Sequence, residues 1–245
     1  WIQEFFGKIP KPARQLVPTY TLEPAQDGER VVELKRVGDT KAVMMAWHIP
    51  AVTHPDSAPF EVLSFVLGDE PTGRLYKALI ETKKATSADS GELELHDPGV
   101  LLISSELLKE GSIEDVEATM KKVIDELITN PPTSEEVDRA KTRILKNLEL
   151  ALTNSARVGL TLSESIAAGD WRLLFLGRDQ LEKVEPADVL RVAKTYLKPT
   201  NRTTGRFIPD SAADRVDVPQ GLPVAELLKD FKGKAEPDWC PGCGD

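Results

Sequence analysis

Cysteine is scarce in this chain of 245 residues. The only two cysteines, Cys240 and Cys243, stand near the C-terminus in the stretch "DWCPGCGD". One C-x-x-C pair offers two thiolates, whereas a structural zinc ion takes four ligands, and no Cys or His elsewhere has the matching spacing. We interpret the pair as an incidental tail, with half of a metal site completed elsewhere and a redox pair as the alternatives.

Histidine is equally scarce, and the three histidines form no known motif. His48 stands in an apolar segment, where we expect a hydrogen-bonded structural role. His54 lies in a loop before Pro55, and His96 is expected to face solvent beside a turn. None belongs to an H-x-x-E-H or H-E-x-x-H helix, which places two imidazoles and a general-base Glu at one zinc ion. The sequence also lacks a G-x-S-x-G elbow and a glycine-rich phosphate loop, so its residues indicate no catalytic constellation.

Long apolar runs and an excess of basic residues are absent as well. No run approaches the roughly 18 to 20 apolar residues that span a bilayer. The chain has 40 acidic and 31 basic residues, a formal net charge of −9, which argues against a nucleic-acid partner because phosphate binding depends on clustered Lys and Arg. The N-terminus begins at Trp1 without a basic or apolar leader. We therefore expect a fragment of a longer polypeptide.

Hydrophobic periodicity predicts strands first and helices afterwards. Alternation predicts an outer strand over 29–37, and the nearly continuous apolar run 41–50 predicts a strand that is buried on both faces. The remaining expected elements are a helix with Asp56 or Ser57 as its cap (57–68), a short helix (73–84), an antiparallel hairpin (91–108), helices over 112–128, 133–152 and 156–171, a helix after Pro186, a closing strand (202–209) and a tail with a short helix at 223–231.

This order predicts an α+β fold, an antiparallel sheet with helices packed on one face. In the first strand of the hairpin, Glu92 and Glu94 alternate with Leu93 and Leu95, and we interpret the two glutamates as the solvent face. We expect three parts: the end of a preceding domain and a linker over 1–22, the folded domain over 23–210, and a linker or tail to a following domain over 211–245.

Three stretches carry a resemblance to a known family: "VLGDEPTGRLYKALIE", "PPTSEEVDRAKTRILKNLEL" and "VEPADVLRVAKTYLKPTNRT". In their order and spacing, over roughly residues 23–209, the chain resembles the inactive second-type domain of the pitrilysin and insulin-degrading (insulinase) family of zinc metallopeptidases. The structural motif of that family falls on Gly73, Arg74, Leu75 and Tyr76.

The resemblance implies a supporting role without catalysis. A later domain of the family supplies an Arg and a Tyr that contact substrate near the zinc ion, and their positions fall here on Ile80 and Ser87. Neither side chain replaces the original group, so we expect no catalytic residue and no metal ligand in this chain.

The implied parent is a zinc metalloendopeptidase whose zinc ligands lie outside this chain. Its implied partners are the preceding zinc-bearing domain, a second half of the same polypeptide and a peptide substrate, with no nucleic acid and no membrane. The implied location is the bacterial periplasm. The alternative function is a catalytically silent scaffold or assembly subunit of the same fold.

Overall fold

The computed structural model describes residues 1–10, 13–14, 24–210, 216 and 219. Contacts divide the chain into one unit that ends at Asp210 and a second unit over Ser211–Asp245. Cys240, Cys243 and the tail helix expected at 223–231 lie outside the described residues. Among the described residues, no helix is both long enough and apolar enough to cross a bilayer.

The first unit is built on a sheet whose five described strands have the order β1-β5-β2-β4-β3. The hairpin predicted from the sequence is confirmed, because β3 and β4 pair antiparallel. The β2–β4 and β2–β5 pairs are antiparallel too, while β1 and β5 run parallel. The sheet is therefore mixed. The strands are β1 (Arg30–Val37), β2 (Ala42–Ile49), β3 (Asp89–Leu93), β4 (Gly99–Glu106) and β5 (Arg202–Asp210).

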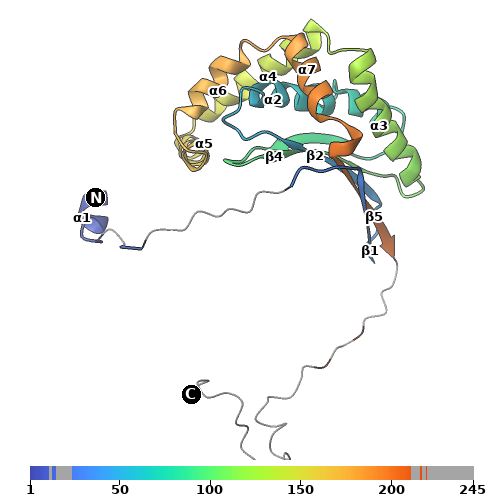
Figure 1. Cartoon of the computed structure of the whole chain (residues 1–245), viewed down its shortest axis with the longest axis horizontal. Coiled ribbons are helices and arrows are strands. Elements are labelled where there is room, and N and C mark those ends of the chain that lie inside the picture. Colours follow the sequence, from blue (N-terminus) through green and yellow to red (C-terminus); the bar gives the residue numbers. More distant parts are fainter. Residues whose placement is uncertain (11–12, 15–23, 211–215, 217–218, 220–245) are drawn as a thin grey trace, which may run out of the picture. The chain divides into compact units, whose positions relative to one another are not determined.

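The helices α2, α3, α4 and α7 lie on one face of the sheet, as Figure 1 shows. This arrangement confirms the predicted α+β class. The helices are α2 (Ser57–Gly68), α3 (Ile113–Thr129), α4 (Ser134–Leu152), α5 (Ser155–Ala167), α6 (Leu173–Leu181) and α7 (Pro186–Tyr196), with the short α1 (Ile2–Phe6), a π-helical turn η1 (Tyr76–Ile80) and a 3₁₀ turn η2 (Pro199–Asn201). The sequence did not predict α6 as a separate helix.

Side-chain caps fix where the long helices begin. Ser112 accepts a hydrogen bond from the backbone of Asp115 at the start of α3. Thr133 and Glu136 form the predicted capping box of α4. The Asn154 side chain accepts hydrogen bonds from two backbone N–H groups at the start of α5, which confirms the predicted break after α4. These bonds satisfy donors that the first turn of a helix otherwise leaves unpaired.

Asp56 does not cap α2 with its side chain, although it occupies the N-cap position. Its carboxylate instead accepts a hydrogen bond from the Tyr196 hydroxyl at 2.8 Å and pairs with Arg191 at 2.7 Å. Burial acts to raise the pKa of Asp56, but the hydrogen bonds from Arg191 and Tyr196 outweigh it and lower the pKa. The side chain thus ties the start of α2 to α7.

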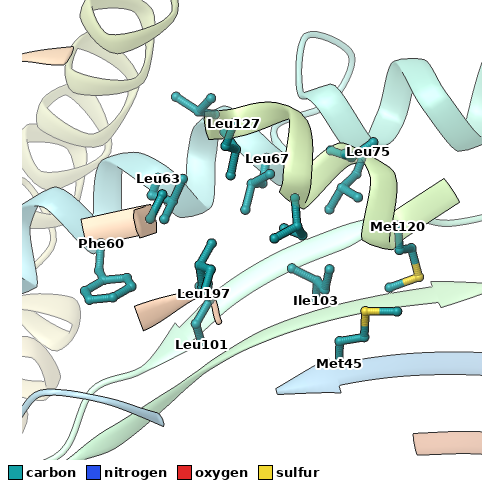
Figure 2. Close-up of a cluster of buried hydrophobic side chains, with 14 of the residues drawn as sticks. Met45, Phe60, Leu63, Leu67, Leu75, Leu101, Ile103, Met120, Leu127 and Leu197 are labelled. Atoms are coloured by element: carbon teal, nitrogen blue, oxygen red, sulfur yellow. The ribbon is translucent and has the colours of Figure 1, made fainter. Parts of the chain in front are cut away.

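The core lies between the sheet and the helices, and its side chains interdigitate as Figure 2 shows. On β2, Val43, Met45 and Trp47 point into this core and are fully buried. Met44 points the other way and is 47% exposed. The prediction that this strand is buried on both faces is therefore wrong, because no described helix covers the second face of the sheet.

An ionic network holds the edge strand β1, whose residues are all exposed. Arg206 on β5 donates to Glu117 on α3 at 2.7 Å and to Glu33 on β1 at 3.1 Å. Lys121 pairs with Glu117 at 2.9 Å and with Glu29 at 3.1 Å. Ion pairs therefore connect the β1–β5 edge of the sheet to the helices, because β1 buries no apolar side chain.

The one-sided core predicts opposite outcomes for two neighbouring leucines on β4. Leu101 is fully buried against the helices, whereas Leu102 lies on the uncovered face and is partly exposed. We expect Leu101→Ala to lower the free energy of unfolding by about 2–5 kcal/mol, and Leu102→Ala to lower it by about 1 kcal/mol or less. Urea unfolding of both variants measures this, and equal losses would show that the second face is also packed.

Candidate functional site

The motif over Gly73, Arg74, Leu75 and Tyr76 joins α2 to the π-helical turn η1. Gly73 lies so close to the preceding turn that a Cβ atom there would sit 2.6 Å from the carbonyl oxygen of Leu67. Only glycine fits this close backbone approach. Leu75 is fully buried in the core. The motif therefore packs the chain tightly between helix and core.

Arg74 joins two of the stretches that carry the family resemblance. Its guanidinium makes two parallel hydrogen bonds of 2.9 Å to the carboxylate of Glu136 at the start of α4. It also donates to the backbone carbonyls of Asn130 and Pro131, at 2.7 and 3.2 Å. This bidentate geometry is the strongest form of an Arg–carboxylate pair. Arg74 is thus fully engaged in fixing the α3–α4 turn.

Glu136 is strongly held in its charged form. Burial acts to raise its pKa, but the hydrogen bonds from Arg74 and from the backbone of Thr133 prevail and lower the pKa to about 2. Both side chains are mostly buried, with 13% of Arg74 and 16% of Glu136 exposed. The pair is a structural clamp.

The two positions that the resemblance assigned to substrate contact serve the domain itself. Ile80 ends η1 and packs against the core. The backbone carbonyl of Ser87 accepts a hydrogen bond from the Ser105 hydroxyl at 2.8 Å. The side-chain hydroxyl of Ser87 accepts a second one from the backbone N–H of Glu106 at 3.3 Å. Both residues contribute packing and sheet contacts, and their lack of a catalytic role stays a prediction.

The described residues do not fit the zinc ion that the resemblance implies for the parent protein. Among them, no group of three or more His, Cys, Asp or Glu side chains is arranged to hold a metal. His48 faces the Asn201 amide, with Nδ1 and Oδ1 3.2 Å apart, which confirms its hydrogen-bonded role. His54 accepts a backbone hydrogen bond from Asp56, and His96 is exposed as predicted.

Three carboxyl groups gather between α2 and β3, where the alternation of β3 led us to expect solvent. Glu92 and Glu94 face the helical layer beside Glu61 of α2, while Leu93 is 51% exposed on the opposite face. The interpretation of the two glutamates as a solvent face is wrong. The predicted alternation is present, but alternation does not tell which side of a strand meets the helices.

Burial raises the pKa of all three carboxyls. It raises that of Glu61 to about 8, with the charges of Glu92 and Glu94 adding to the effect. It raises the pKa of Glu92 to about 7 despite a hydrogen bond from Ser64, and that of Glu94 despite one from Ser57. Desolvation and like charges both penalise ionisation. Glu61 and Glu92 therefore take up protons near neutral pH.

Glu61 and Glu94 open into the acid groove, which we define as the cavity of about 970 Å³ enclosed by α2, the end of β3, α4, α5 and α6. Asp97 and Glu164 are also part of its lining, together with one arginine, Arg178. Leucines from α4 and α6 form much of the remaining wall. Sequence reasoning missed this groove, because it brings α2 and the end of β3 against α4, α5 and α6, which follow much later in the sequence.

Comparison with known proteins confirms the resemblance. Residues 1–144 match the profile of the family described as the Peptidase M16 inactive domain. The chain is 25% identical over 205 residues to the zinc protease PqqE of Helicobacter pylori, covering 82% of this chain and 46% of that protein. It therefore spans about half the length of this curated relative.

Two solved structures share the fold. The inactive peptidase domain of a proposed zinc protease from Bordetella parapertussis is 34% identical, with a TM-score of 0.68, and the match covers 76% of this chain and 99% of that one. The periplasmic protease PqqL of Escherichia coli is 15% identical, with a TM-score of 0.64, covering 85% of this chain and 23% of that one. The second likeness shows the fold alone.

The clamp predicts a stability loss that disappears in acid. We expect Glu136→Gln to lower the free energy of unfolding at pH 7 by about 1.5–3 kcal/mol, the range for hydrogen bonds to charged groups. The pKa of Glu136 in the folded protein is depressed to about 2, so the stabilisation is present above the ordinary glutamate pKa of 4.5 and is lost as pH falls from 4.5 towards 2. Guanidinium unfolding across this pH range measures it.

The matched control is Glu135→Gln, one residue earlier on the same helix. Glu135 is 87% exposed and pairs only loosely with Arg139, at 3.4 Å. We expect its replacement to change stability by less than about 0.5 kcal/mol at any pH. Equal losses in the two variants would contradict the assignment of Arg74 and Glu136 as a clamp.

The acid groove predicts the opposite pH dependence. The pKa of Glu61 in the folded protein is raised to about 8, so the folded protein holds a proton that the unfolded chain releases above the ordinary glutamate pKa of 4.5. Stability therefore falls as pH rises from 4.5 to 8. We expect Glu61→Gln to be more stable than the parent at pH 8.5 by about 1–3 kcal/mol in denaturant unfolding. A variant less stable than the parent at that pH would contradict this.

Proposed function

Because the chain belongs to the family of Peptidase M16 inactive domains, we propose that it is the non-catalytic domain of a zinc-dependent peptidase. In this proposal it packs against the zinc-bearing domain of its parent protein and helps to enclose a peptide substrate. The observation that carries the proposal is the uncovered face of the sheet, whose side chains are apolar and only partly buried.

The uncovered face runs across the whole sheet. Val32 and Leu34 on β1, Met44 on β2 and Leu93 on β3 are each between 47% and 57% exposed. Leu102 on β4 lies between them and pairs in register with Ala46 of β2. Exposed apolar side chains on one face of a sheet favour an interaction site, since a sheet is stable when both of its faces are satisfied.

The N-terminal helix α1 supports the same proposal. Its residues are all exposed, and the exposed fractions of Trp1, Phe5 and Phe6 range from 64% to 94%. No described residue buries these aromatic side chains. We propose that residues 1–22 continue a preceding domain, where such side chains find cover, and that residues 211–245 lead to a following one.

The zinc ion belongs to the preceding domain in this proposal, because the described residues here offer no set of ligands. In this proposal the chain itself contributes a rigid surface that borders the substrate. The clamp between Arg74 and Glu136 fixes α4, and the sheet presents a broad apolar surface. We further propose a second half of the same polypeptide as a partner and the bacterial periplasm as the location.

We expect zinc-dependent hydrolysis of a quenched fluorescent peptide library only when the chain is extended upstream through the preceding domain. Within that extended protein, Met44→Asp places a charge in the proposed interface and lowers turnover about tenfold, which corresponds to about 1.4 kcal/mol. Ile128→Asp is the matched control, since Ile128 on α3 is 48% exposed, as Met44 is 47% exposed, but lies in the helical layer.

Three outcomes would speak against the proposal. Turnover by the 245-residue chain alone would show that the zinc site has been misplaced. Turnover by the double variant Ile80→Arg with Ser87→Tyr would show the same, because the zinc ligands are still expected outside this chain. An extended protein that binds no zinc and hydrolyses nothing, while Met44→Asp still disrupts its assembly, would favour the silent scaffold instead.

A further inference from the structure

The acid groove holds carboxyl groups that have no cationic partner in the described part of the chain. Glu94 accepts a hydrogen bond from the Ser57 hydroxyl, and neither Glu61 nor Glu94 forms an ion pair with a described residue. Both side chains belong to the lining of the groove. Buried carboxyl groups are normally paired with a cation, so the unpaired Glu61 and Glu94 favour a basic ligand.

The walls of the groove are apolar and loosely packed. The helix α5 has no buried residue, and α6 has one, Leu181. Leu176, on the groove side of α6, is 51% exposed. A cavity lined by hydrophobic side chains with a few convergent polar groups is the usual form of a binding site.

The guanidinium in the lining is already engaged. Arg178 donates to the carboxylate of Asp179 at 2.7 and 2.9 Å and lies over the ring of Phe175, 5.7 Å from its centre. Asp97 and Glu164 add their carboxylates to the same cavity. The groove therefore carries an excess of negative charge within an apolar wall, which complements a cation on an apolar chain.

We propose that the acid groove binds an unfolded peptide that inserts a Lys or Arg side chain between Glu61 and Glu94 and lays its apolar neighbours against α6. The cation takes the place of the protons on Glu61 and Glu94 and forms charge-assisted hydrogen bonds with both carboxylates. The flanking apolar side chains cover leucines that the domain leaves exposed.

The carboxyl groups of the acid groove suit a transient peptide better than a permanent partner. The raised pKa values let the carboxyls take up protons when no cation is present, so the domain tolerates an empty groove near neutral pH. A segment that never leaves would gain nothing from this tolerance. The inference goes beyond the proposed function, because it concerns this domain alone and needs no zinc ion.

The test compares two fluorescein-labelled peptides binding to the whole 245-residue chain at about pH 7.5. One has the sequence GSLARLASG, and the other replaces its arginine with citrulline, which keeps the shape and removes the charge. We expect the arginine peptide to bind at least about tenfold more tightly by fluorescence anisotropy, a difference that one satisfied ion pair supplies. Raising the salt concentration should weaken only the arginine peptide.

The double variant Glu61→Gln with Glu94→Gln is expected to abolish the difference between the peptides. It removes unpaired buried charge, so it should keep the fold, and circular dichroism verifies this. Leu176→Asp should weaken both peptides at least about threefold, since it damages the apolar wall. The control Glu149→Gln removes an exposed carboxylate of α4 outside the groove and should change nothing.

Two results would overturn the inference. The first is equal binding of the two peptides, or a preference that survives the double variant, because the carboxyls would then play no part. The second is self-association of the chain that the double variant abolishes and the peptide competes with, measured by sedimentation. That result would assign the groove to a second copy. Activity of the extended peptidase is not used, so this test is independent of the proposed function.

Discussion

The structure depends on one constraint: the helices of this domain cover a single face of its sheet. The central strands β2 and β4 therefore each have one side buried in the core and one side that no described helix covers. On β2 the division is sharp, with Met45 fully buried and its neighbour Met44 half exposed. This uncovered apolar surface supports the proposal that the domain packs against a neighbouring one.

The same constraint explains the reversed alternation of β3. Leu93 turns away from the helices, towards the uncovered face, while Glu92 turns towards them. In a free-standing domain this arrangement would be costly twice, through an exposed leucine and a desolvated carboxyl. In a domain with a neighbour on its second face, the leucine is satisfied there. The glutamates then become available to line a groove on the first face.

The sequence predicted those features that local physics decides. The start of α4 follows from Thr133 and Glu136, and the break before α5 follows from Asn154, because a cap acts within one helical turn. The hairpin of β3 and β4 follows from alternation around a turn. The parallel pairing of β1 with β5 was beyond such reasoning, because it joins segments that stand at opposite ends of the folded domain's sequence. The face assignment of Glu92 failed for a related reason: alternation is symmetrical, and only the tertiary arrangement breaks that symmetry.

The motif at 73–76 shows why fold and chemistry can separate in a domain of this kind. Gly73 is required by a backbone approach that leaves no room for a Cβ atom, and Arg74 is required by four hydrogen bonds that reach across to α4 and the turn before it. Removing either would disturb the fold itself. Ile80 and Ser87 meet weaker demands, a packing contact and two sheet hydrogen bonds, which many side chains satisfy. The positions that hold the fold are therefore fixed by close packing and by hydrogen bonds, whereas the positions that the resemblance assigns to substrate contact are less constrained. A domain of this kind can lose the residues that contact substrate and still keep its fold.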